Sequence, residues 1–231
     1  MKKIKAILCS IVFASMTSFS PLSADSSDFA GLYFGLQSSA VGVELDGSHA
    51  ANEQSDDTTI TSTGAIGKFA IIGGAEAGYA IPLGDTFMLD IGASLIGGAA
   101  SFSTDTDDGA SSSSDKVTFE ADDFTTVYIA PTIAVGDQAS IYLKLGVVDA
   151  ETSVTGDVNK PGDLQGTLVG IGSRTLLNNS LFIRTEAGMI DFDQISTKGK
   201  GTSGQKGIST STEVKADPTM AYGSVSVGVK F

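Results

Sequence analysis

The chain has 231 residues, of which 41% are hydrophobic, 7% are aromatic and 18% are charged, with 28 glycines, no tryptophan and a net charge of −13. This apolar content excludes an intrinsically disordered chain, and the excess of acid excludes a nucleic-acid binder, which needs positive charge to meet phosphates. The length allows one or two ordinary domains, or one larger β architecture.

The chain begins with the pattern of an export signal. Three lysines within the first five residues precede an apolar run over 6–16, and a small-residue cleavage site ends at Ala24. This segment is too short for a membrane-spanning helix, so we predict a signal peptide over 1–24 and one domain over 25–231. The only cysteine, Cys9, lies in the signal, and the mature chain has 11 Lys and Arg against 27 Asp and Glu, a net charge of −16.

The rest of the chain alternates apolar and polar residues, the pattern of half-buried strands. No later stretch reaches the ~18 consecutive apolar residues of a spanning helix. An even number of strands suits a closed antiparallel membrane barrel, in which closure pairs every backbone N–H and C=O group. Eight segments show the alternation, near 31–44, 68–82, 86–102, 124–136, 141–147, 164–177, 180–190 and 222–231.

The connections between these segments alternate strictly between short and long. Such barrels have short turns on the periplasmic rim and long loops outside the cell. A soluble β-sandwich, the alternative all-β architecture, does not require this alternation. The short turns are 82–85, 136–139 and 178–180, and the four long connections are 46–67, 103–123, 149–163 and 191–217.

The long connections hold most of the negative charge. They carry 13 of the 16 net negative charges of the mature chain, so the acidity belongs to the predicted outer surface. The acids of 105–109 lack the spacing of a calcium loop, and Lys116 stands where a distal Glu is required. We therefore predict a hydrated acidic surface, with no metal site and no cofactor.

The inward faces of the strands carry a nearly balanced set of charges. An eight-stranded barrel has room inside for little more than its own side chains, so unpaired charges there would be costly. Many inward glycines leave room for long basic side chains and for water. We predict an interior charge network that closes the lumen, and a narrow selective pore lined by the same groups remains the alternative. Its members are Glu76, Asp90, Lys144, Arg174, Arg184, Glu186 and Lys230.

The single histidine, His49, lies near Asp46 and Ser48 in the first long connection. Acyl-transfer chemistry requires a histidine held against a serine hydroxyl and an acid, and closeness in sequence does not supply that geometry. We expect a surface histidine and no enzymatic activity.

The last strand ends on an aromatic residue. Val225, Val227, Val229 and Phe231 share one face, which resembles the closing strand of bacterial outer-membrane barrels, where it is the recognition signal for the assembly machinery. The mature chain is similar to the small eight-stranded outer-membrane barrels that include the OmpA transmembrane domain, OmpX, OmpW and opacity-type surface proteins.

This resemblance implies a fold, a location and a set of partners. The fold is an all-β, eight-stranded antiparallel transmembrane barrel with short periplasmic turns and four long extracellular loops, in the bacterial outer membrane. The implied partners are outer-membrane lipid and lipopolysaccharide, the assembly machinery and an extracellular ligand of the loops, and the expected state is a monomer. Members of the family act in adhesion or envelope integrity, so we predict that role. A narrow channel for small solutes is the alternative, and an outer-leaflet lipid-modifying enzyme is a more distant one.

Overall fold

A computed structural model describes residues 25–50, 64–98, 100–105, 116–155, 159–198 and 213–231, and the predicted signal peptide lies outside them. No helix among the described residues is long and apolar enough to cross a bilayer. A short 3₁₀ helix, η2 (Ser26–Phe29), precedes ten strand segments: β1 (Gly31–Ala50), β2 (Gly64–Pro82), β3 (Phe87–Gly97), β4 (Ala100–Asp105), β5 (Lys116–Gly136), β6 (Ala139–Thr155), β7 (Leu164–Leu176), β8 (Leu181–Phe192), β9 (Ile195–Lys198) and β10 (Glu213–Lys230).

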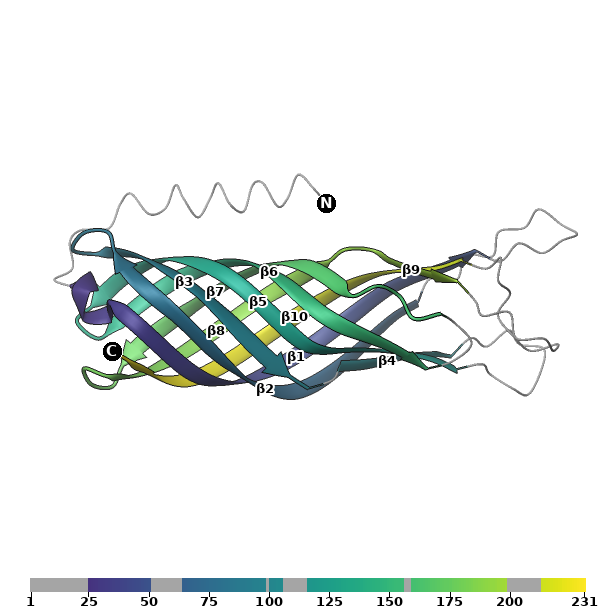
Figure 1. Cartoon of the computed structure of the whole chain (residues 1–231), viewed down its shortest axis with the longest axis horizontal. Coiled ribbons are helices and arrows are strands. Elements are labelled where there is room, and N and C mark those ends of the chain that lie inside the picture. The colour runs from purple at the N-terminus through teal and green to yellow at the C-terminus, as the bar shows by residue number, and fades with distance from the viewer. Residues whose placement is uncertain (1–24, 51–63, 99, 106–115, 156–158, 199–212) are drawn as a thin grey trace, which may run out of the picture.

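These segments form one closed antiparallel barrel of eight wall positions (Figure 1). Neighbours in the chain pair in the order β1, β2, β3, β5, β6, β7, β8 and β10, and pairing of β1 with β10 closes the sheet. Strand β4 pairs with β5 beyond the end of β3, and β9 pairs with β10 beyond β8. The predicted fold class is therefore confirmed.

The two ends of the barrel differ as the sequence predicts. The tight turns between β2 and β3, β5 and β6, and β7 and β8 lie at the end that also holds η2 and the C-terminus (Figure 1). The Asn178 carboxamide accepts hydrogen bonds from the backbone N–H groups of Ser180 and Leu181 at 2.9 and 2.8 Å, which stabilises one of these turns. By topology this end is the periplasmic rim.

The strands extend further toward the outer end than the alternation predicts. Strand β5 begins at Lys116 and β10 begins at Glu213, so the prediction that 116–123 belongs to a loop is wrong. The ladder between β5 and β6 continues past a register shift at Asp122, because backbone pairing outside the bilayer does not require apolar side chains. Asp123, at φ 49°, absorbs this irregularity.

The outer face of the barrel is apolar around its middle. Side chains such as Leu36, Ile91 and Ile171 are 73%, 45% and 66% exposed, which in water would be a large uncovered hydrophobic surface. Toward the outer rim the same faces become acidic: Val147 is followed by Asp149, and both are exposed. The apolar band is the surface that contacts lipid, and the protein is a transmembrane β-barrel.

A charge placed in the apolar band should oppose membrane insertion. Ile91 lies at the centre of the outward face of β3, and we expect Ile91→Lys to lower the free energy of unfolding in lipid vesicles by at least about 2 kcal/mol. Thr167→Lys, at an exposed position closer to the acidic rim, should lower the free energy of unfolding much less. Urea titrations in vesicles would measure both, and equal costs would contradict the assigned position of the membrane.

Candidate functional site in the barrel interior

The lumen contains three buried ion pairs, each joining strands that are distant in the sequence. Arg184 Nη1 lies 3.0 Å from Glu76 Oε2, and Lys144 Nζ lies 3.0 Å from Glu186 Oε1. Arg174 pairs with Asp90 at the shortest separation, 2.5 Å. All six side chains are at most 9% exposed, so six of the seven predicted interior charges meet inside the barrel.

The seventh predicted residue, Lys230, is not part of this network. It lies at the periplasmic end of β10, opposite Tyr33 of β1, and it is only partly buried. Among the residues that the structure describes, no ion pair or hydrogen bond of its side chain is seen. The described interior therefore balances three acids with three bases, because the end of the barrel lets Lys230 reach water.

Neutral donors complete the coordination of the buried carboxylates. Glu76 accepts hydrogen bonds from Ser226 at 2.9 Å and from the Tyr128 hydroxyl at 3.4 Å. Glu186 accepts from the hydroxyls of Tyr142 at 2.8 Å and Tyr222 at 2.7 Å. Charge-assisted bonds of this kind compensate the desolvation of each carboxylate.

Two arginines face each other directly across β7 and β8. Arg174 and Arg184 occupy opposed register positions, where like charges repel. The Tyr33 ring lies near both, with its centroid 4.7 Å from Arg174 Cζ and 5.3 Å from Arg184 Cζ. Nε of both arginines and Nη2 of Arg184 have no hydrogen-bond partner among the described residues, and the cation–π contacts with the aromatic rings stabilise the two guanidinium groups.

Each inward tyrosine lies against an inward glycine of a neighbouring strand, a pairing that the sequence does not reveal. The sequence led us to expect that these glycines leave space for basic chains and water. The structure instead shows aromatic rings lying over them, so close that a Cβ atom built on any of them would lie 2.4–2.7 Å from a ring or hydroxyl atom. The opposed pairs are Tyr33 with Gly78, Tyr128 with Gly92, Tyr142 with Gly172 and Tyr222 with Gly188.

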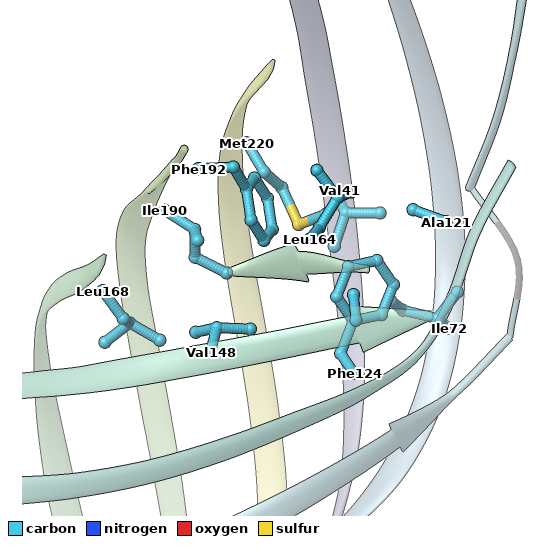
Figure 2. Packing of buried hydrophobic residues seen from close by; sticks show 11 residues of the cluster. Val41, Ile72, Ala121, Phe124, Val148, Leu164, Leu168, Ile190, Phe192 and Met220 are labelled. Atoms are coloured by element: carbon cyan, nitrogen blue, oxygen red, sulfur yellow. The ribbon is translucent and has the colours of Figure 1, made fainter. Parts of the chain in front are cut away.

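Two apolar clusters lie on either side of the charged layer. The outer cluster includes Val41, Phe124, Leu168, Phe192 and Met220, whose side chains point toward one another inside the curved wall (Figure 2). The periplasmic cluster consists of Phe29, Tyr33, Ala80, Met88, Ala134, Leu176 and Phe182. Charged residues thus fill the middle of the lumen and apolar residues fill both ends.

A small cavity remains between the charged layer and the outer cluster. Lys144, Glu186 and Tyr222 line its polar side, and Phe124 and Met220 belong to its apolar side. Its volume is about 20 Å³, and one water requires roughly 10–15 Å³. The cavity can therefore hold one or two waters.

The remaining predicted residues lie away from this layer. His49 is near the outer end of β1, in register with Val214 of β10. Val225, Val227 and Val229 face outward on β10, and Phe231 is 74% exposed at the periplasmic end. Among the described residues, no group of three His, Cys, Asp or Glu side chains could hold a metal ion.

The structure is similar to solved structures of outer-membrane proteins. The outer membrane protein OprG from Pseudomonas aeruginosa has a TM-score of 0.57 at 15% identity, over 91% of this chain and 99% of that one. Neisserial surface protein A and the attachment invasion locus protein Ail of Yersinia pestis, the latter solved with a heparin analogue, have TM-scores of 0.46 and 0.44 at 11% and 9% identity. They cover 86% and 87% of this chain and 97% and 99% of their own chains. No family model and no curated protein matches the sequence.

Proposed function

From its fold as a small eight-stranded outer-membrane β-barrel, we propose that this protein has a structural or surface-interaction role, in adhesion or envelope integrity, carried by its acidic outer surface. The observation that supports this proposal is the filled lumen. Paired charges occupy its middle, apolar clusters occupy both ends, and the cavity between the charged layer and the outer cluster has room for one or two waters. A barrel with this interior acts through its surfaces.

The outer rim is the surface that would meet a ligand. Exposed carboxylates follow directly above the apolar band on three different strands: Asp149 and Glu151 on β6, Asp191 on β8 and Asp217 on β10. This acidity suits a ligand that is basic or that carries bound cations. We also propose that the apolar band contacts lipopolysaccharide and that the protein is a monomer. The assembly machinery would recognise the last strand, and His49 would have no enzymatic role.

The test separates surface function from transport. Deletion of 51–63 and 106–115, with the heat-shifted gel mobility of a folded barrel as the control, should reduce cell adhesion and detergent resistance while uptake of small solutes stays constant. In a planar bilayer the refolded protein should show no conductance steps. Defined ion-selective steps that change when Lys144 and Arg184 are neutralised would contradict the proposal and favour a channel.

A narrow channel for small solutes remains the second candidate, because among the described residues no backbone ladder joins the outer part of β2 to β4. Pairing of β2 with β3 ends at Gly73 and Gly97, while β2 continues to Gly64 and β4 pairs with β5. Ile72 and Ile96, beside this break, line the cavity. In this second candidate a small apolar solute would pass sideways at the break, between the cavity and the bilayer, and faster uptake of such a solute by Phe124→Ala than by the unaltered protein would support it.

A further inference from the structure

The segment that precedes β1 folds under the periplasmic end of the barrel. Phe29, in η2, is 0% exposed and packs in the periplasmic cluster. The other members of that cluster come from six strands: Tyr33 of β1, Ala80 of β2, Met88 of β3, Ala134 of β5, Leu176 of β7 and Phe182 of β8. The site that receives Phe29 is therefore built from nearly the whole circumference of the barrel.

Polar contacts attach the same segment to the turn between β2 and β3. The backbone N–H of Ser26 donates a hydrogen bond to the Asp85 carbonyl at 2.7 Å, and its hydroxyl donates to the Gly84 carbonyl. Ser26 is 1% exposed. The Asp25 side chain accepts from the Ser27 N–H at 2.8 Å and caps η2, and hydrogen bonds from the Ser27 side chain and backbone lower the pKa of the Asp25 carboxyl.

The segment joins β1 at the seam where the barrel closes. Gly31 has a φ of +112°, and a Cβ atom there would lie 2.2 Å from the Phe231 carbonyl oxygen. The Phe231 N–H donates to the Leu32 carbonyl at 2.9 Å. The first residues of the wall, the last residue of the chain and the docked segment thus meet at one place.

We propose that residues 25–30 form a closure latch, which docks only after β1 has paired with β10 and then slows the reopening of that seam. The docking site does not exist in an open sheet, because Tyr33 and Phe182 come from the strands on either side of β10. Contacts that form after the rate-limiting step of folding leave the folding rate unchanged and slow unfolding.

The first test is Phe29→Ala in the full-length protein, with folding and unfolding rates in lipid vesicles followed by heat-shifted gel mobility. We expect at least tenfold faster unfolding and a folding rate within twofold of the unaltered protein. Asp28→Ala, an exposed neighbour in η2, should change neither rate. A folding rate reduced in proportion to the loss of stability would mean that the segment docks early, and unchanged rates in Phe29→Ala would mean that it does not hold the barrel closed; either result overturns the proposal.

A disulfide provides a second test that does not depend on removing Phe29. Ser26→Cys and Asp85→Cys, with Cys9→Ser so that no other cysteine remains, place two thiols on hydrogen-bonded neighbours. The disulfide should form only in the species with the mobility of the closed barrel, and the oxidised protein should unfold at least tenfold more slowly than the reduced one. The latch proposal is overturned if the disulfide forms as fast in the open species as in the closed barrel. It is also overturned if the oxidised and the reduced protein unfold at the same rate.

Discussion

Replacing Arg184 with Met is expected to lower the free energy of unfolding by about 3–5 kcal/mol, because it leaves a buried carboxylate without its cation. Glu76 is 5% exposed, and its other hydrogen bonds come from the neutral hydroxyls of Ser226 and Tyr128. Arg184 also lies over the Tyr142 ring, with Cζ 4.6 Å from the centroid, so its removal loses packing as well. Urea titrations in lipid vesicles would measure the change.

Two further variants distinguish a lost ion pair from a general packing defect. Glu76→Gln combined with Arg184→Met removes both charges and should recover a large part of the loss, which a double-mutant cycle would quantify. Lys160→Met removes one partner of an exposed pair, in which Lys160 and Asp163 are 4.0 Å apart, and should change stability by less than about 0.5 kcal/mol. If Arg184→Met lowers the free energy of unfolding by no more than Lys160→Met does, the interior pairs do not stabilise the barrel.

Adding one methyl group at Gly172 is expected to lower the free energy of unfolding by about 3 kcal/mol or more. The Cβ atom of Gly172→Ala would lie 2.4 Å from the Tyr142 hydroxyl and 2.5 Å from the backbone oxygen of Thr185. Overpacking costs typically about 1–3 kcal/mol. Displacement of the Tyr142 ring would also break its 2.8 Å hydrogen bond to Glu186, and a hydrogen bond to a charged group contributes about 1.5–3 kcal/mol.

The matched control is Gly73→Ala on the outer face of β2. The nearest atom to a Cβ there, the Gln37 carbonyl oxygen, is 3.9 Å away, so the substitution should be neutral or slightly stabilising. Tyr142→Phe isolates the hydrogen bond and should cost less than Gly172→Ala. Equal unfolding free energies for Gly172→Ala and Gly73→Ala would show that the aromatic rings move aside without cost, contrary to a close-packed interior.

Much of the architecture was predictable because its signals are local. The alternation of Val225, Val227 and Val229 identifies the lipid face of β10 without knowledge of its neighbours, because side chains of a strand alternate between two faces. The same alternation assigns Glu76 and Arg184 to the inner face. Turn residues such as Asn178 mark the periplasmic connections, since their side chains bond to their own turn.

The sequence by itself determined an antiparallel barrel of eight wall strands, its topology and the residue types on each face. Only the tertiary structure decided which acid meets which base, since Glu76 and Arg184 are 108 residues apart and their meeting depends on the register of every strand between them. The same register places tyrosines opposite glycines, lets Lys230 reach water, and brings Phe29 under the barrel. A shift of one residue in any ladder would exchange the faces of a strand, so these contacts depend on closure, which no local pattern encodes.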